Sequence, residues 1–541
     1  MNILGISGGI RQGNQDGAAA LIRDNMIVAS AEEERFTRIK HSPGVLPENA
    51  IRFCLKEAGI SIEDVDQVTF PGATYQNFGE ILEDFFKFRF NHSPHIQLID
   101  HHHAHAASAF YVSGFDEAMI LTMDLSGDNK STTMSYGHDN KIERIREFLK
   151  PNSLGLFYSC ITEYLGFQYD TDEYKVMGLS SYGKPEYDMS WFVRQDAENG
   201  DYSFDPSYVM QGIKPGASHP SKQLKLGSDV LWQKLGHPRR RGEPITDHHA
   251  NVAASAQRHL ENIAINLVTW LHQKTGSRKL CLAGGVALNC VMNQKLRALP
   301  FIDEIYIQPA ASDAGLALGG AVTAAVDAGY RFPKMRHAFL GPSFSDDEIE
   351  KSLNTFGVRY TKVEDIAKTT AQKVAEGKIV GWFQGKMELG PRALGARSII
   401  ADPRDASMKD KVNELVKFRE EFRPFAPSIL AERVRDFFED GGDDPFMVIT
   451  CDTKEEKKGV IPAVVHVDGT ARTQTVEKPT NCLYYRMISE FCKLTDVPVV
   501  LNTSFNIKGQ PVVLNPQQAI STFFGTGMNC VAIGSFLLEK S

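Results

Sequence analysis

Short apolar segments separated by polar turns open the chain, and a longer amphipathic stretch follows them. The segments NILGIS, AAALIRD and MIVASAEEE, within residues 2–34, predict three β-strands. The stretch LPENAIRFCLKEAG has apolar residues at helical spacing and predicts a helix, after which DQVTF predicts a further strand. Segments with the pattern of strands thus alternate with a segment that has helical spacing, and this alternation favours an α/β domain.

The same order of elements returns from Glu117. The segments AMILTMDLSGD, STTMSYG and IERIREF predict three more strands, and SLGLFYSCITEYLG predicts the helix after them. Repetition of this kind is typical of a duplicated nucleotide-binding sheet. It implies a cleft between two similar halves, with the strand-to-turn tips facing that cleft.

A chain of 541 residues is too long for one hydrophobic core, so at least two domains are expected. Residues 331–346 hold two prolines and little periodicity, and they divide a domain at 1–335 from one at 345–541. Residues 185–248 are polar and Pro-rich, which predicts a variable insertion at the rim of the cleft. Beyond the boundary, strands such as KIVGWF and VPVVLNT alternate with helical stretches, so the second domain is also expected to be α/β.

Composition and charge narrow the choice of partners. The net charge of −8 argues against a nucleic acid held by bulk electrostatics. Eight cysteines occur without any CxxC pair, which excludes zinc fingers and fits a reducing compartment. The chain starts directly on a strand, and no apolar window of about 18 residues occurs. We therefore expect a cytoplasmic protein that neither spans a membrane nor binds nucleic acid.

A cluster of four histidines in DHHHAHAASAF carries the first candidate chemistry. His101 and His105 are four residues apart in a stretch that favours helix, so both imidazoles would project from one face. Asp124 closes an apolar strand and Asp313 follows another, and their carboxylates could complete a divalent metal site. An isolated HxxxH pair is more often a pair of solvated or core histidines, but the density of histidine here favours the metal. Two imidazoles and two carboxylates suit iron or zinc.

A glycine pair offers a second candidate. Gly284 and Gly285 stand between a buried strand and a helix, where a backbone can approach phosphate or ribose closely. Tight packing of the helix against the strand would explain the same pair.

The second half of the chain gathers cations in short segments bounded by Gly and Pro. Arginine presents a planar fork that matches phosphate or carboxylate, and lysine adds a point charge. Each residue taken singly could be a solvated surface cation, but together they predict a pocket for a small, highly charged anion. These residues are Arg392, Arg397, Lys417, Arg423 and Arg472.

Several motifs together resemble the O-carbamoyltransferase family, which includes aminoglycoside, cephalosporin and nodulation-factor carbamoyltransferases. The motifs occur in order over nearly the whole chain, so coincidence is implausible. They are ILGIS with AAALIRDNMIVASAEEERFTRIKH, HHHAHAASAFYVSG, EYKVMGL, AGGVALN, ASDAGLALG, GPRALGARS, FRPFAPS, DGTARTQTV and LNTSFNIKGQP.

The resemblance implies a fold for each domain and a reaction. The N-terminal domain would be a duplicated, RNase H-like domain of the actin and sugar-kinase superfamily, and the C-terminal domain would be similar to threonylcarbamoyl-adenylate synthases. Carbamoyl phosphate would be broken down and would react with ATP to give carbamoyl-adenylate. The carbamoyl group would then pass to a hydroxyl of a small acceptor, typically a specialised metabolite. The resemblance leaves open whether Mg²⁺ accompanies ATP and whether the protein forms a homodimer.

The resemblance also implies roles for individual residues. His101, His105, Asp124 and Asp313 match the residues that bind iron in the family, which favours Fe(II) over zinc. The positions that match nucleotide-binding motifs are Lys175, Gly178, Gly284, Gly285 and Asn289. The positions that match residues around carbamoyl phosphate are Arg392, Lys417, Arg423, Arg472 and Asn502, of which Lys417, Arg423 and Arg472 are expected to be catalytic.

The sequence departs from the family where the acceptor would be activated. The first turn often reads HDSAA or HDASA, but Gln15 stands in place of the histidine here. Glutamine cannot take a proton, so Asp16 is the obvious candidate for the base. Leu125 also replaces a glycine of the frequent DGxGE motif. Two other functions stay open: a catalytically inactive metal- and nucleotide-binding scaffold, and carbamoyl transfer of the hydrogenase-maturation type, which joins related domains in another order with zinc fingers.

Overall fold

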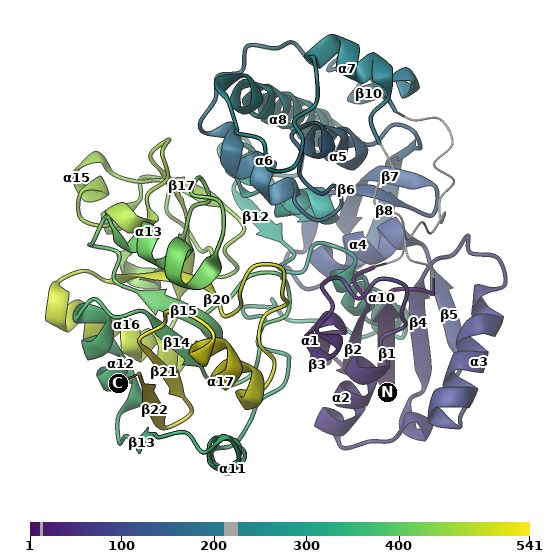
Figure 1. Cartoon of the computed structure of the whole chain (residues 1–541). Helices are drawn as coiled ribbons and strands as arrows, with labels where there is room; N and C mark the ends of the chain where they lie inside the picture. Colours follow the sequence, from purple (N-terminus) through teal and green to yellow (C-terminus); the bar gives the residue numbers. More distant parts are fainter. Residues whose placement is uncertain (11–14, 210–225, 541) are drawn as a thin grey trace. The chain divides into compact units, whose positions relative to one another are not determined.

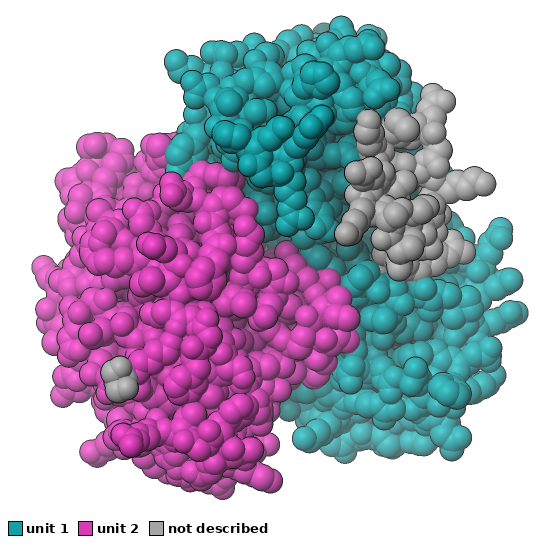
Figure 2. Space-filling view, viewed as in Figure 1, with its two compact units in different colours: residues 1–33, 41–335 teal, residues 34–40, 336–541 magenta. Residues whose placement is uncertain are grey.

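The computed structural model describes residues 1–10, 15–209 and 226–540, and the chain divides into two compact units (Figure 1). Unit 1 comprises Met1–Glu33 and His41–Met335, and unit 2 comprises Glu34–Lys40 and Arg336–Ser541; Figure 2 colours the two units separately. The short segment Glu34–Lys40, which contains α1 (Glu34–Thr37), was not expected in unit 2.

Unit 1 contains two five-stranded sheets with the same topology. The first has the order β3-β2-β1-β4-β5, built from β1 (Asn2–Ser7), β2 (Ala18–Arg23), β3 (Met26–Glu32), β4 (Gln67–Pro71) and β5 (Ile96–Ile99). The second has the order β12-β11-β6-β7-β8, built from β6 (Glu117–Gly127), β7 (Lys130–His138), β8 (Lys141–Leu149), β11 (Lys279–Ala283) and β12 (Glu304–Ile307).

In each sheet the first three strands in the chain pair antiparallel, and two later strands extend the sheet in parallel. The predicted duplication is therefore confirmed, and the fold is the duplicated, RNase H-like fold of the actin and sugar-kinase type.

Two helices lie between the sheets of unit 1. Helix α10 (Ala314–Asp327) contacts β1, β2 and β4 of the first sheet, whereas α4 (His101–Phe110) contacts β6, β7 and β11 of the second. The two helices also contact each other, so the order of layers is sheet, helix, helix, sheet. Helices α5 (Leu154–Tyr164) and α8 (Asp247–Thr275) also contact β6 and β7. Strand β6 is consequently buried over most of its length, and its apolar residues are concentrated between Ala118 and Met123.

The remaining helices of unit 1 are α2 (Glu48–Ala58), α3 (Phe78–Phe90), α6 (Glu173–Ser180), α7 (Asp229–Leu235) and α9 (Cys290–Arg297). The predicted insertion at 185–248 contains the hairpin β9 (Val193–Asp196) and β10 (Asp201–Phe204), followed by α7. Its residues 210–225 lie outside the described residues.

Unit 2 is organised on a mixed eight-stranded sheet, in the order β13-β22-β21-β14-β15-β20-β16-β19. Its strands are β13 (Thr361–Lys362), β14 (Val380–Phe383), β15 (Arg397–Ala401), β16 (Ala426–Leu430), β19 (Gln474–Val476), β20 (Val499–Ser504), β21 (Cys530–Ile533) and β22 (Phe536–Glu539). A separate two-stranded ribbon joins β17 (Thr450–Asp452) and β18 (Thr470–Arg472).

The helices of unit 2 cover this sheet and bury one large apolar core. Trp382 of β14 lies at its centre, fully buried, and its indole N–H donates to the carbonyl of Gly395. The helices are α11 (Asp346–Phe356), α12 (Ile366–Ala375), α13 (Met408–Val412), α14 (Val434–Phe437), α15 (Glu455–Lys458), α16 (Cys482–Thr495) and α17 (Pro516–Phe524). After α13 the chain forms one π-helical turn, Asn413–Lys417, which ends at Phe418 in the left-handed conformation. Such turns are frequent at functional sites.

No helix among the described residues is long and apolar enough to cross a membrane.

Candidate functional sites

The four predicted metal ligands lie together in unit 1. His101 Nε2 is 3.1 Å from Asp124 Oδ2 and 3.6 Å from Asp313 Oδ1. His105 Nε2 is 3.7 Å and 3.6 Å from the same two oxygens. One ligand atom from each of the four residues lies within 4.8 Å of the others. The cluster therefore has the dimensions of a single-ion site.

Polar contacts fix the start of α4 and so aim the two imidazoles. The Asp100 side chain caps the helix by accepting from the backbone N–H of His103, and it pairs with Lys130 and Arg144. The carboxylate of Asp128 accepts from the backbone N–H of His101. The same carboxylate accepts from the backbone N–H groups of Ala73 and Thr74. Asp100 and Asp128 thus hold the helix end that presents His101.

The carboxylates come from two different kinds of position. Asp124 lies within β6 where the pairing with β7 shifts register, so a local irregularity of the strand presents it. Asp313 was expected at the end of a strand, but it stands at the N-cap of α10. A loop after β12 therefore delivers the second carboxylate, and the helix begins directly after it.

The charges of the cluster fit a cation. Burial alone would lower the pKa of His105, but Asp124 and Asp313 outweigh it and raise the pKa to about 9. Burial raises the pKa of Asp124, yet His101 and His105 reverse that effect and hold it well below its usual range. Neither ring nitrogen of His105 has a hydrogen-bond partner among the described residues. A buried imidazole in that state fits a metal ligand, because coordination would satisfy it.

A glycine makes room for the ligand cluster. A Cβ atom at Gly127 would lie 2.1 Å from the ring of His101, so the imidazole occupies the space that any other side chain would need. The ligand cluster therefore depends on Gly127, which has no side chain that could bind the ion.

The predicted nucleotide-binding glycines lie next to the metal cluster, and one of them is required by packing. Gly284 has a φ of +87°, and a Cβ there would lie 2.2 Å from the carbonyl oxygen of Met123. The backbone N–H of Gly285 donates to Asp124 Oδ1 at 3.3 Å. Close packing against β6 thus accounts for Gly284, and Gly285 supports a candidate ligand. Their contact with a nucleotide stays a prediction.

The other predicted nucleotide-binding residues are held by internal contacts. The Asn289 side chain caps α9 and exchanges hydrogen bonds with the Gln257 side chain. Lys175 and Gly178 lie in α6, where Lys175 Nζ donates to Asp172 at 2.9 Å. Contacts within unit 1 therefore hold the Asn289 and Lys175 side chains, and the role of these residues toward a nucleotide stays a prediction.

In unit 2, the predicted anion-binding segments converge on β20. Lys417 Nζ donates to the carbonyl of Ser504 at the end of β20. Asn502 of β20 donates from Nδ2 to the carbonyl of Ala393, beside Arg392. Gln474, two residues after Arg472, accepts from Asn502 Nδ2 at 3.1 Å. Segments far apart in the sequence are thereby tied to one strand.

Apart from Arg397, Lys417 is the most buried of these cations. Its ammonium lies 2.7 to 3.2 Å from four oxygens, two of Ser504 and two of Asn506. Burial, together with the charges of Arg419 and Arg423, lowers its pKa well below the usual range. Arg423 is therefore an electrostatic neighbour of Lys417, and it lies 3.7 Å from the carboxylate of Glu420. Asn502 Oδ1 is buried without a partner among the described residues.

Arg397 does not belong with the anion-binding cations. It is fully buried, its guanidinium stacks on Phe383 at 3.7 Å, and it donates to the carbonyls of Pro342, Gln384 and Gly385. A guanidinium engaged in this way supports the core of unit 2. The expectation that all five cations line one pocket is therefore wrong for Arg397.

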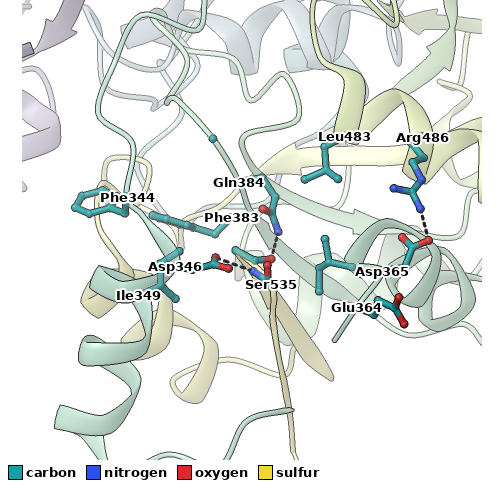
Figure 3. A pocket seen from close by; sticks show the side chains of 13 residues that line it. Phe344, Asp346, Ile349, Glu364, Asp365, Phe383, Gln384, Leu483, Arg486 and Ser535 are labelled. Carbon is teal, nitrogen blue, oxygen red and sulfur yellow. Dashed lines mark hydrogen bonds and ion pairs between the residues drawn. The ribbon is translucent and has the colours of Figure 1, made fainter. Parts of the chain in front are cut away.

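Unit 2 also contains a pocket of about 320 Å³ that none of the predicted site residues lines (Figure 3). Asp346, Glu364 and Asp365 contribute its carboxylates. Asp346 accepts from the backbone N–H of Ser535, and Asp365 pairs with Arg486. Its wall includes Gln384, whose carbonyl accepts from Arg397. The pocket thus lies beside a structural arginine.

Three residues of unit 1 were missed at the sequence level. Asp128 organises the start of α4, as described above. His41 lies 2.7 Å from Asp16, measured between Nδ1 and Oδ1. Desolvation and the carboxylates of Glu173, Asp16, Asp313 and Asp124 raise the pKa of Asp170 well above its usual range. Asp128 and Asp170 are acidic residues in polar turns, which are too common to single out, and a lone His41 carries no local signal.

The fold and the sites together define a two-unit α/β protein with a candidate metal centre in the duplicated unit 1 and a candidate cationic site near β20 in unit 2. The family described as carbamoyltransferase N-terminus matches residues 3–91 and 72–322, and carbamoyltransferase C-terminus matches residues 371–540. The chain therefore belongs to the carbamoyltransferase family, which confirms both the resemblance and the prediction of an enzyme.

Relatives extend this likeness over most of the chain. Nodulation protein NolNO of Sinorhizobium fredii is 37% identical over 592 residues, covering 100% of this chain and 83% of that protein. Nodulation protein NolO of Bradyrhizobium diazoefficiens is 40% identical over 452 residues, covering 82% and 79%. Among solved structures, the T. kodakarensis HypF matches at 13% identity and a TM-score of 0.34, covering 60% of this chain and 48% of that one. At that distance the likeness carries no argument about function.

Proposed function

We propose that this carbamoyltransferase is an ATP-dependent O-carbamoyltransferase. It converts carbamoyl phosphate through carbamoyl-adenylate and transfers the carbamoyl group to a hydroxyl of a small acceptor, which we expect to belong to specialised metabolism. Carbamoyl phosphate and ATP are both polyanions, so a reaction between them requires their repulsion to be neutralised. The observation that carries this proposal is the gathering of cationic segments around β20.

The residues of unit 2 supply that neutralisation in the proposal. The charge of Arg423 acts on Lys417 and lowers its pKa, and the planar guanidinium of Arg423 suits a phosphate group. Arg392, Arg472 and Asn502 belong to segments that the hydrogen bonds around β20 tie together. In the proposal, Arg423 and Arg472 bind and orient the phosphoryl group of carbamoyl phosphate, and Arg392 and Asn502 complete the site. Lys417, whose ammonium is held by Ser504 and Asn506, adds its positive charge beside Arg423.

The residues of unit 1 serve the transfer step in the proposal. His101, His105, Asp124 and Asp313 fit a divalent ion, for which we propose Fe(II), with zinc as the alternative. Such an ion supplies Lewis-acid stabilisation of negative charge at a phosphate. The backbone around Gly284 and Gly285, with Lys175, Gly178 and Asn289, would receive the nucleotide, and Asp16 would serve the acceptor hydroxyl.

The test measures all products at once. The protein is incubated with ATP, carbamoyl phosphate and a panel of hydroxylated compounds, and AMP, pyrophosphate and phosphate are quantified. Mass spectrometry searches each compound for the mass increase of one carbamoyl group. We expect AMP only when carbamoyl phosphate is present. Absence of AMP with every compound counts against the proposal, and ATP binding by calorimetry without turnover favours an inactive scaffold.

A further inference from the structure

The pocket of unit 2 in Figure 3 has the walls of a small-molecule site. Its volume of about 320 Å³ falls in the range of ligand pockets. One part of the wall is apolar, and it consists of Phe344, Ile349, Ile366, Phe383 and Leu483. The rest of the wall is mainly polar, so the pocket suits a ligand that combines a short apolar body with polar groups.

The ionisable side chains of this pocket carry an excess of negative charge. Asp346, Glu364 and Asp365 contribute carboxylates, and Arg486 contributes a guanidinium. Arg486 pairs with Asp365, and the other oxygen of Asp365 accepts from the backbone N–H of Lys368 in α12. The carboxylates of Asp346 and Glu364 form no ion pair with any described residue. Because charges in enclosed sites are normally paired, a ligand with two positive charges would balance the pocket.

These two carboxylates keep oxygen atoms that a ligand can reach. Asp346 Oδ1 accepts from the backbone N–H of Ser535 at 3.1 Å, whereas Oδ2 accepts from none of the described residues. Glu364 is exposed, and its carboxylate likewise accepts from none of them. Neither side chain contributes to the polar atoms that are enclosed without a partner, so both carboxylates have surface open to solvent.

A buried amide provides a further open acceptor in the same pocket. Gln384 is 8% exposed, and its side-chain N–H groups donate to the carbonyls of Gly534 at 3.0 Å and Ala532 at 3.4 Å. These two contacts turn Oε1 away from the carbonyls, and Oε1 accepts no hydrogen bond from the described part of the chain. It is not one of the enclosed atoms without a partner, so it keeps accessible surface. A largely buried acceptor of this kind calls for a donor from outside the chain.

The open acceptors lie at two ends of the pocket. Asp346 and Gln384 contact the same turn, through Ser535 and Gly534 respectively, which places them at one end. Glu364 directly precedes Asp365 at the start of α12, and Figure 3 shows it on the other side of the pocket from Asp346. A ligand that reaches both ends therefore needs two donor groups with a spacer between them.

We propose that this pocket binds a small aliphatic diamine, a site that is independent of the proposed carbamoyl transfer. One ammonium group donates to Asp346 and to Gln384 Oε1, since an ammonium carries three N–H donors. The methylene chain lies against the apolar wall, and the second ammonium group pairs with Glu364.

The experiment titrates the full-length protein with putrescine in an amine-free buffer and follows binding by calorimetry. Butylamine has the same carbon chain with one charge, and butanediol has it with none. We expect one putrescine per chain, butylamine at least about 10-fold weaker, and no binding of butanediol, because hydrogen bonds to charged groups are the strong ones. Asp346→Asn and Glu364→Gln should each lower the affinity for putrescine about 10-fold. The control is Asp347→Asn, an exposed neighbour on α11 outside the pocket, which should change it less than about twofold.

Each outcome decides for or against the diamine site. No binding of putrescine to the wild type overturns the proposal, and so does equal binding of butylamine, because the second carboxylate would then have no role. An equal loss in Asp347→Asn would assign the binding to diffuse attraction by an acidic surface. Glu364→Gln changes an exposed side chain and keeps the fold, so its full retention of affinity also contradicts the proposal.

Discussion

Unit 1 and unit 2 each bury an ionisable side chain at their candidate site, but the two side chains differ in their hydrogen-bond partners. In unit 1, both ring nitrogens of His105 lack a hydrogen-bond partner among the described residues, although the ring is fully buried. In unit 2, Lys417 is almost as deeply buried, but four oxygens surround its ammonium. The first group is incomplete without a ligand, whereas the second is already complete.

This difference shows what each site requires. A buried polar atom without a partner costs about 1–3 kcal/mol, so the His105 site is less stable until something coordinates it. The oxygens around Lys417 hold its ammonium in one position, although burial and the charges of Arg419 and Arg423 lower its pKa. Unit 1 therefore has a site that binding completes, and unit 2 has a cation that is fixed before any anion arrives.

The largest expected effect is on metal affinity, and it comes from replacing His105, whose ring nitrogens lack hydrogen-bond partners among the described residues. His105→Leu replaces the imidazole with an apolar side chain of similar size, so the cluster loses one of its four ligands. Because even a partner of a ligand contributes 10–100-fold to metal affinity, we expect the loss of a ligand to lower metal affinity by more than about 100-fold. Metal content by elemental analysis and carbamoyl transfer should fall together.

The matched control for that substitution is His102→Leu. His102 is also fully buried in α4, but its Nδ1 is hydrogen-bonded to the Thr122 hydroxyl at 2.7 Å. We expect His102→Leu to lower stability while the metal content stays near that of the wild type. Full metal content in His105→Leu would contradict the candidate centre.

A pair of arginines sharpens the comparison inside unit 2. Arg423→Ala should abolish the use of carbamoyl phosphate, with at least about a 100-fold loss of activity, as for loss of an electrostatic donor, and should leave nucleotide binding intact. Arg397→Met should do something else, because it leaves buried carbonyls at Pro342, Gln384 and Gly385 without their donor. We expect it to lower the free energy of unfolding by about 3 kcal/mol or more.

Activity assays and urea unfolding of both arginine variants test this separation. If Arg423→Ala lost nucleotide binding as well, Arg423 would have to act elsewhere. If Arg397→Met kept wild-type stability, the guanidinium would not support the core.

The contrast between these arginines also marks how far the sequence can predict the structure. The strands of both sheets in unit 1 were predictable except β5, because apolar runs of strand length recur in the same order. Apolar residues at helical spacing in α8 begin at Ala250, but the helix begins at Asp247, because a capping box of Thr246 and His249 adds a polar turn that no apolar period signals.

Long-range contacts account for what the sequence could not predict. The segment 34–40 belongs to unit 2, where Arg35 donates to the Gly390 carbonyl and Arg38 donates to the carbonyls of Pro511 and Val512. Arg397 and Arg423 lie in similar Gly- and Pro-rich segments, and only the fold separates a buried cation from an accessible one. The four metal-ligand candidates were predictable because histidines at helical spacing carry a local signal, whereas His41 pairs with Asp16 across 25 residues.

A smaller effect tests whether the cluster depends on space as well as on ligands. Gly127→Ala places a methyl group where the His101 ring lies, 2.1 Å from its nearest atom, so the imidazole must move. We expect metal affinity to fall by about 10–100-fold, similar to the loss of a group that orients a ligand. Gly79→Ala is the control, since nothing lies within 4 Å of its Cβ position. Equal metal affinity in the two variants would show that the ring of His101 is not confined.

The smallest effect concerns pH and the metal-free protein. In the absence of metal, Asp124 and Asp313 raise the pKa of His105 to about 9, against about 6.5 in the unfolded chain. Protonation of His105 therefore stabilises the folded protein fully below pH 6.5, and this stabilisation is lost as the pH rises through 9. The difference is at most about 3 kcal/mol, because each pKa unit corresponds to about 1.4 kcal/mol.

Metal binding should change with pH in the opposite direction. A metal ion competes with the proton on His105, so affinity should rise between pH 6.5 and 9 while the stability of the metal-free protein falls. Unfolding of chelator-treated protein across this range measures the second quantity, and titration with the metal measures the first. His105→Leu should remove most of both trends, because it removes the group that titrates. A metal-free protein with the same pH dependence in wild type and variant would assign the titration to another residue and leave His105 neutral.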